Sequence, residues 1–330
     1  MNKTCTVLPK KDSFKSSEKA GKIFFIEDYV DISSVSEARK LADTIYFENK
    51  EFISQYKHSK YSISWAWYSD IFQFCITYLE IQNLIQIIED NNFTSIEIGA
   101  ISPQYIQIFK VYFFRRNIVL LGSQSNQLIN TFKQVIFNGF ALIYSLISLV
   151  FFILRPGKNV GTYTGDFIYK NTQSDFRLSN LYAQYKKNKI HYVEFIRITK
   201  SKNFLDNIFK RKRFAIYHTS IIFFVALFTK KEKYTKYPVN FYQSVIYSFH
   251  YDNLVLKKSI LIIEKLFIIL RINNFISISF SSRSAHLSIA AKSLGIKTIG
   301  IMHGLQQKDY AVYEFMESYS ERQKIGCDIY

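Results

Sequence analysis

A histidine followed by a glycine stands at the end of the clearest strand in the sequence. The run 297–302 is mostly apolar and predicts a strand, and His303 and Gly304 follow it directly. Ligands of open α/β sheets bind beyond the carboxyl ends of strands. A histidine there can donate to a phosphate oxygen or act as an acid or base near neutral pH, and Gly304 permits a sharp turn or a close approach to a ligand. We take His303 as the candidate catalytic residue and Gly304 as a binding residue; the alternative is a histidine that only ties down a loop.

A second set of candidates lies at the start of the preceding helix. Ser282, Arg283 and His286 follow a predicted strand at 275–280 and begin a helix that runs to Leu294. The free N–H groups at a helix N-terminus attract anions, so these three side chains are candidate substrate-binding residues. Ordinary helix capping and solvation explain them equally well.

Asp175 and Arg177 are candidates for binding an acceptor, although an Asp that caps a helix and a surface Arg are the simpler interpretation. The sequence contains no Asp-x-Asp motif and no Cys/His cluster with metal-ligand spacing, so no metal is expected. It also has no Walker loop, no Gly-x-Gly-x-x-Gly and no Gly-x-Ser-x-Gly. Kinase, dehydrogenase and hydrolase activities gain no support, and no bound cofactor is expected.

The elements that would position these residues alternate between strands and helices. Near the C-terminus, a strand, a helix, a stop at Gly295 and a second strand form a βαβ unit, which implies a parallel sheet. We expect one α/β domain over residues 23–320, after a disordered, Lys- and Ser-rich lead-in at 1–22. The expected strands are 23–26, 95–98, 118–121, 160–164, 192–198, 214–217, 275–280 and 297–302.

One segment, within an insertion at 130–155, is too apolar for a surface helix. Residues 135–154 carry no charged side chain, Lys133 precedes them, and Arg155 and Lys158 follow. About 20 apolar residues suffice to cross a bilayer, with a buried core helix as the alternative. A single span would place strands of one sheet on opposite sides of the membrane. We therefore expect the segment to enter one leaflet without crossing it, with its basic flanks near anionic lipid. The alternative is that a second apolar segment, such as 214–228, returns the chain across the membrane, although it is short for a span and contains His218.

Composition limits the partners of this chain of 330 residues. Its net charge of +17 favours an anionic partner, either lipid or a nucleotide diphosphate. Nucleic acid is not expected, because no recognised binding motif occurs. Hydrophobic residues make up 48% of the chain, and its mean hydropathy near zero is too polar for a polytopic membrane protein. The three cysteines are far apart, which fits a reducing compartment.

The stretch 284–304 resembles a pattern in GT-B glycosyltransferases of bacterial surface-polysaccharide synthesis. Its helix carries Ala-Ala-Lys at 290–292, and the turn at Gly295 and a strand then lead to the His-Gly loop. The resemblance covers about residues 160–330. Further stretches of the chain also resemble these glycosyltransferases: Glu314-Phe315-Met316, Asp175-Phe176-Arg177-Leu178, Leu181-Tyr182 and Tyr192-Val193-Glu194-Phe195.

The resemblance implies a Rossmann-like parallel sheet of the N-terminal, acceptor-side domain type, with the His-Gly loop facing a cleft. It implies transfer of a sugar from a nucleotide-sugar donor, as substrate, to a lipid-linked or surface-glycan acceptor at the cytoplasmic face of the membrane. GT-B enzymes place a donor-binding domain after this loop, whereas only residues 305–330 follow Gly304 here. We expect 321–330 to be the start of a missing second domain. The alternatives are a non-catalytic membrane-associated scaffold or pseudoenzyme, and a membrane protein of unrelated function.

Overall fold

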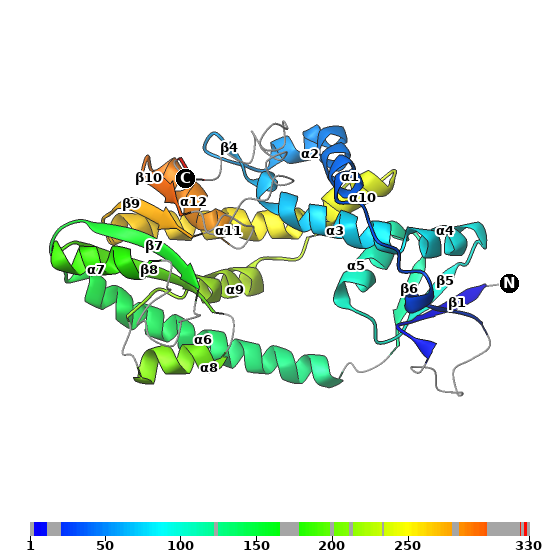
Figure 1. Ribbon diagram of the computed structural model, residues 1–330, viewed down its shortest axis with the longest axis horizontal. Helices are drawn as coiled ribbons and strands as arrows, with labels where there is room; N and C mark the ends of the chain where they lie inside the picture. The colour runs from blue at the N-terminus through cyan, green and yellow to red at the C-terminus, as the bar shows by residue number, and fades with distance from the viewer. Residues whose placement is uncertain are drawn as a thin grey trace. The chain divides into compact units, whose positions relative to one another are not determined.

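The structure is a computed structural model of the whole chain, and it divides into two compact units (Figure 1). Unit 1 comprises residues 1–52, 68–128 and 233–250, and unit 2 comprises 53–67, 129–232 and 251–330. The structure describes residues 3–11, 21–121, 125–165, 178–198, 201–210, 214–232, 234–278, 284–301, 324 and 327–328.

Unit 1 contains a parallel sheet of four strands in the order β2-β1-β5-β6. The central strand β1 is buried continuously from Cys5 to Leu8, as expected where both faces of a parallel sheet are covered. The strands are β1 (Thr4–Leu8), β2 (Lys22–Phe25), β5 (Ser95–Ile98) and β6 (Asn117–Leu120).

Helices supply the rest of unit 1. Ser34 and Ser102 cap the helices that follow them, and Pro103 occupies the first turn of the second, as its fixed φ favours. The hydroxyl of Ser244 donates to the carbonyl of Val111, which ties α10 to α5. The helices are α1 (Val35–Glu48), α2 (Lys50–Gln55, which ends in unit 2), α3 (Tyr68–Glu80), α4 (Gln82–Asp90), α5 (Pro103–Tyr112) and α10 (Phe241–Ser248).

Unit 2 contains a second parallel sheet, with the order β10-β9-β7-β8. A short segment at 214–217 extends it beyond β8, because Ile216 bridges to Phe195 in parallel. The chain therefore starts at the central strand β7, steps outward to one side, and returns to the other side with β9 and β10. These strands are β7 (Asn159–Gly165), β8 (His191–Arg197), β9 (Ile272–Ser277) and β10 (Lys297–Gly300).

This order places a topological switch point between β7 and β9, where open α/β sheets bind ligands at the carboxyl ends. Close packing against β9 explains Gly161, because an added Cβ would lie 3.0 Å from the Phe275 ring and 3.1 Å from Ile272. Gly295 has a φ of +69°, which favours glycine and ends the last helix.

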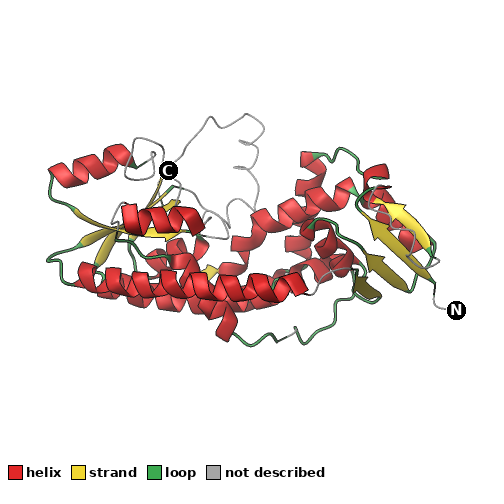
Figure 2. Cartoon of the chain, turned by 90° about the horizontal axis from the view of Figure 1, so that it is seen from below, coloured by secondary structure: helices red, strands yellow, loops and turns green. Residues whose placement is uncertain are grey.

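The helices of unit 2 include α6, the longest of the described elements (Figures 1 and 2). A small hairpin of β3 (Lys57–His58) and β4 (Tyr61–Ser62) completes the unit. The helices are α6 (Ser125–Ile153), α7 (Ser179–Lys187), α8 (Ser201–Leu205), a π-helical turn (Asp206–Lys210), α9 (His218–Phe228), α11 (His250–Ile269) and α12 (Ala285–Ser293); a 3₁₀ turn (Ile63–Trp67) precedes α3.

The structure confirms an α/β protein with parallel sheets, and it differs from the prediction in two respects. The described strands form two parallel sheets and a small hairpin rather than one sheet. The disordered lead-in expected at 1–22 is wrong for Thr4–Leu8, because these residues form β1, which pairs on both sides. Of residues 321–330, Asp328 packs on unit 2: its carboxylate accepts the Thr298 N–H at 2.9 Å and lies 3.0 Å from the Lys292 ammonium.

Candidate functional site

Two histidines from different helices of unit 2 meet where the strands end. His218 opens α9 directly after the edge segment 214–217, and His286 lies in the first turn of α12 after β9. Their Nδ1 and Nε2 atoms, respectively, are 2.9 Å apart, so one ring donates its N–H to the other. Both side chains are fully buried. The ring of Tyr163 on β7 packs edge-on against His218, with 5.4 Å between centroids.

Burial determines the charge of this pair. Desolvation lowers the pKa of His218 well below its usual value, with a further lowering by His286. The same burial lowers the pKa of His286 to about 3. A buried imidazolium without a counter-charge is costly, so both rings are neutral at pH 7. The pair can therefore accept or relay a hydrogen bond, but it offers no imidazolium acid.

Several buried polar atoms near the strand ends have no hydrogen-bond partner among the described residues. They include the outward ring nitrogens of the histidine pair, His218 Nε2 and His286 Nδ1. The hydroxyls of Ser220, Ser288 and Thr164 share this property. Buried polar groups are nearly always hydrogen-bonded, because an unmade bond costs free energy. These atoms lie toward the carboxyl edge of unit 2, the edge at which open α/β sheets bind ligands.

Only one of the seven predicted site residues, His286, is among the residues that the structure describes. His286 was expected at an anion-attracting helix start, and it is instead sealed in the pair with His218. The strand that leads to His303 is present as β10. The positions outside the described residues are His303, Gly304, Ser282, Arg283, Asp175 and Arg177.

Sequence reasoning did not select His218, although a signal was present. His218 follows the short apolar strand at 214–217, as His303 follows β10. A position directly after a predicted strand of a parallel sheet makes His303 a candidate, and the same pattern makes His218 one.

An apparent catalytic triad in unit 2 is structural. Oε1 of Glu264 lies 2.6 Å from Nε2 of His58 and also accepts the hydroxyl of Ser293. The carboxylate stands between the other two groups, whereas a nucleophilic triad needs the histidine in the middle. The contacts connect the β3–β4 hairpin to α11 and α12. Among the described residues, no three His, Cys, Asp or Glu side chains come together to hold a metal ion.

Helix α6 closes the edge of the sheet in unit 2. The backbone N–H of Tyr217 donates to the Ser145 hydroxyl at 2.9 Å, and the N–H of Ala215 donates to Ser148 at 3.2 Å. An edge strand otherwise leaves such groups unpaired. The two serines lie one turn apart on the buried side of α6, together with Ala141. The helix is therefore fixed along the strand at 214–217.

We expect the double substitution Ser145→Ala with Ser148→Ala to lower the free energy of unfolding by about 2–4 kcal/mol, since each leaves a buried N–H unsatisfied. Urea unfolding measures this loss. Ser259→Ala is the matched control, because that buried hydroxyl only donates to the Val255 carbonyl in its own helix. An effect of the double variant no larger than twice that of the control would contradict the proposed role of the serines.

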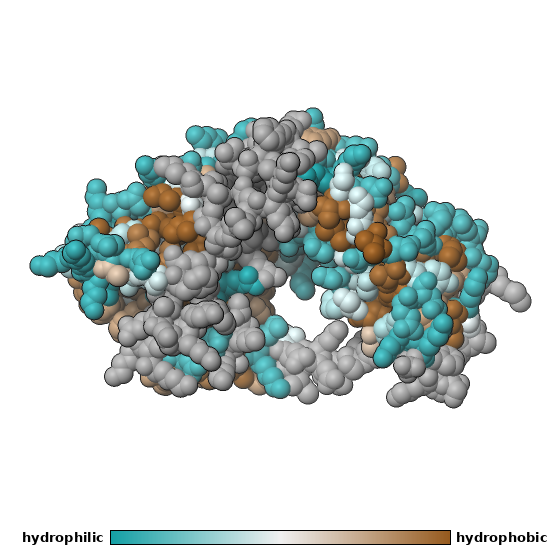
Figure 3. All heavy atoms as spheres, in the orientation of Figure 1, coloured by the Kyte–Doolittle hydropathy of each residue, from teal (hydrophilic) through white to brown (hydrophobic). Residues whose placement is uncertain are grey.

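The opposite side of α6 is apolar and open. The segment Thr131–Ile153 is the one described helix that is by itself long and apolar enough to cross a membrane, and only 22% of its most apolar window is buried. A core helix of a soluble protein would be mostly buried. Large hydrophobic residues are also visible elsewhere on the surface (Figure 3). The exposed residues of α6 and its end are Phe132, Ile136, Phe140, Ile143, Leu146, Ile147, Val150, Phe151, Ile153 and Leu154.

Comparison of the chain with protein-family models, with curated proteins and with solved structures finds no match in any of the three.

Proposed function

We propose that the chain attaches to the cytoplasmic face of a membrane and transfers a sugar from a nucleotide-sugar donor to a lipid-linked or surface-glycan acceptor. The observation that carries the proposal is the open apolar side of α6 on the same unit as a parallel sheet with a ligand-type switch point. An enzyme that joins a soluble donor to a membrane-bound acceptor needs both features on one body.

The way α6 is held supports attachment from one side. Ser145 and Ser148 bind the sheet edge, so a helix crossing the bilayer would carry that edge into hydrocarbon. Lying in the interface, α6 can bury its open side while the sheet stays in water. Lys133 lies before the most apolar part of α6, and Arg155 and Lys158 follow it, where each can meet anionic headgroups.

The strand order and the resemblance support a donor site at the carboxyl edge of the sheet in unit 2. Nucleotides bind open α/β sheets at the carboxyl edge near a switch point, here the ends of β7 and β9. In sequence, His303 comes three residues after Gly300, the last residue of β10, and β10 is the neighbour of β9 in the sheet. We assign His303 the acid–base or phosphate-binding role, and the neutral pair of His218 and His286 a supporting role at the carboxyl edge of the sheet.

A second function, a membrane-bound scaffold without catalysis, is favoured by one observation. The two described histidines at the sheet edge are fully buried, and their lowered pKa values keep them from exchanging protons near pH 7. This site therefore provides binding groups rather than acid–base groups unless His303 supplies the chemistry.

Membranes that contain the chain, incubated with radiolabelled UDP-, GDP- and CMP-sugars, distinguish the two functions. We expect label from one donor to enter a lipid or polymer fraction, and His303→Ala to lower the rate by roughly 100-fold or more, as loss of a general acid or base does. His191→Gln, at the opposite end of β8, should leave the rate unchanged. No transfer from any donor by a folded, membrane-bound chain would favour the scaffold.

A further inference from the structure

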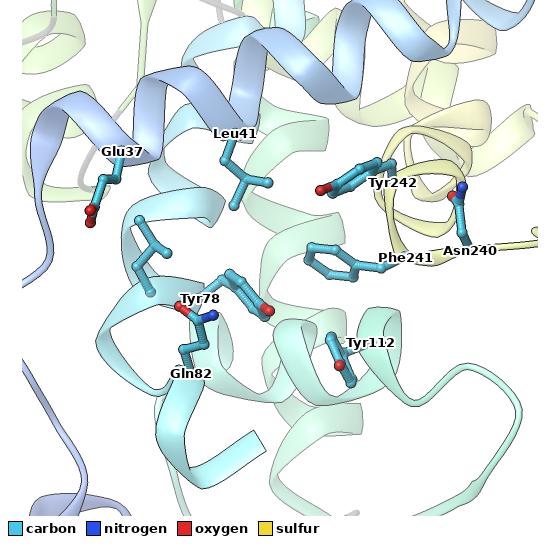
Figure 4. Close-up of a pocket in the computed structure, with 9 residues that line it drawn as sticks. Glu37, Leu41, Tyr78, Gln82, Tyr112, Asn240, Phe241 and Tyr242 are labelled. Atoms are coloured by element: carbon cyan, nitrogen blue, oxygen red, sulfur yellow. The ribbon is translucent and has the colours of Figure 1, made fainter. Parts of the chain in front are cut away.

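Two adjoining hollows in unit 1 meet at Tyr112 and Phe241. The larger has a volume of about 500 Å³, within the range of roughly 300–1,000 Å³ of small-molecule sites, and the smaller about 310 Å³. The larger hollow, drawn in Figure 4, is lined by Glu37, Leu41, Tyr78, Leu79, Gln82, Tyr112, Asn240, Phe241 and Tyr242.

The bend between two helices opens this hollow. The axis turns by 64° between α3 and α4, at Ile81. Tyr78 therefore lies on the last turn of α3, and Gln82 begins α4 in a new direction. The start of α10 supplies the facing wall through Phe241 and Tyr242 (Figure 4).

Three aromatic rings line the hollow. The ring of Phe241 lies 4.7 Å from that of Tyr78 and 5.1 Å from that of Tyr112, and the two tyrosine rings are stacked at 5.9 Å. All three side chains are half-buried, so part of each ring faces the hollow. The face of such a ring carries negative charge density, which attracts the weakly positive C–H groups on one face of a sugar ring.

Polar groups with spare hydrogen-bonding capacity surround these rings. The Asn240 carbonyl oxygen accepts the Gln243 N–H at 2.9 Å, which fixes the side chain and leaves its NH₂ to donate. Neither the Gln82 amide nor the Glu37 carboxylate forms a hydrogen bond or ion pair with any described residue. Sugar hydroxyls donate and accept, so they match a mixture of amide and carboxylate.

Charge and polarity argue against anionic ligands and against purely apolar ligands. Glu37 is the one ionised side chain among the residues that line the larger hollow, so a phosphate or another anion would be repelled. A purely apolar ligand would cover the Gln82 and Asn240 amides without bonding them, which costs free energy. A separate contact fixes the Tyr112 ring, which lines both hollows. The Tyr112 hydroxyl donates to the Glu89 carboxylate at 2.5 Å, and Glu89 lines the smaller hollow.

We infer that unit 1 binds a neutral glycan, with one sugar ring stacked on Phe241 and the adjacent tyrosines in the larger hollow and its hydroxyls bonded to Gln82, Glu37 and Asn240. The site lies within unit 1 and is separate from the sheet edge of unit 2. It gives the proposed transferase a means of holding its acceptor, but glycan binding itself does not depend on transfer.

The test uses the full chain and ligand-observed saturation-transfer NMR with the methyl glycosides of glucose, galactose, mannose, rhamnose and N-acetylglucosamine. We expect at least one glycoside to be saturated, and Phe241→Leu and Gln82→Leu each to weaken its binding about 10-fold or more. The matched control is Gln86→Leu, one turn along α4, where the amide instead donates to Asp90. It should bind as the unmodified chain does.

The inference would be overturned if none of the five glycosides showed saturation transfer. It would also be overturned if Gln82→Leu bound the glycoside as tightly as the unmodified chain. Gln82 is exposed, so this variant should fold even if Phe241→Leu does not, and thermal unfolding checks both. Glycan binding without transfer would count against the proposed function alone. Transfer without glycoside binding would count against this site alone.

Discussion

Phe140→Glu combined with Ile147→Glu is expected to release the chain from vesicles of anionic lipid. Both side chains lie on the open side of α6 and are 62% and 53% exposed, so the substitutions should leave the fold intact. Burying a large apolar side chain is worth about 1.5–3 kcal/mol. Losing two such side chains should therefore weaken binding by roughly 10²- to 10⁴-fold, because each 1.4 kcal/mol is a factor of ten. Vesicle co-sedimentation measures the change.

A charge-matched control separates apolar insertion from general electrostatics. Ile32→Glu with Val35→Glu adds the same two charges at exposed apolar positions of unit 1. This control variant should bind the vesicles only slightly less tightly than the unmodified chain. High salt should weaken the vesicle binding of both proteins, because it screens the attraction between their charges and the lipid. If the α6 variant sediments with vesicles as the unmodified chain does, α6 is not the attachment surface. If the variant instead changes the oligomeric state of the chain in the absence of vesicles, the open side of α6 is an interface between two copies of the chain.

Local patterns predicted the elements that need only local information. The apolar run at 135–154 lies largely within α6, and the strands expected at 160–164 and 192–198 correspond to β7 and β8 within one or two residues. Gly295 ends α12 as expected. In each case, hydrophobic periodicity or a positive φ acts over a few neighbouring residues, so a single sequence contains the signal.

Long-range pairing was not predictable in the same way. β1 is a short strand beside a Lys- and Ser-rich stretch, and its burial depends on β5, some 90 residues away, with which Val7 pairs at Ile98. Whether strands form one sheet or two depends on such pairings, which leave no local pattern. For this reason the sequence predicts a single domain with one parallel sheet, whereas the described strands form two parallel sheets in two units.

The candidate site illustrates the same limit at the level of side chains. The sequence placed His286 correctly at the start of a helix, but an N-terminal histidine looks solvated unless its neighbour is known. That neighbour, His218, is 68 residues away in the chain. Contact between α9 and α12, rather than any property of either helix alone, converts an anion-attracting position into a neutral buried pair.

The buried pair should make the stability of the fold depend on pH in a specific window. Both folded pKa values are lowered from 6.5, to about 3 for His286, so between these limits the unfolded chain binds more protons than the folded one. Stability is then fully present above pH 6.5 and falls as the pH drops toward 3. At pH 5.5, which is one unit below the unfolded pKa, the loss is on the order of 1 kcal/mol for each histidine.

Urea unfolding at pH 7.5 and 5.5 measures this difference. In His286→Gln and in His218→Gln we expect about half of the loss to disappear, because one titrating group is removed while an amide can keep the hydrogen bond. His191→Gln, a half-buried histidine outside the pair, should keep the dependence of the unmodified chain. The carboxyl of Asp328 does not interfere at these two pH values. Partial burial raises its pKa, but hydrogen bonds with Thr298 and Lys292 outweigh this and lower the pKa from 3.8, so its contribution is fully present at pH 5.5 and 7.5. An unchanged pH dependence in both pair variants would mean that His218 and His286 are hydrated in solution and do not form the sealed pair.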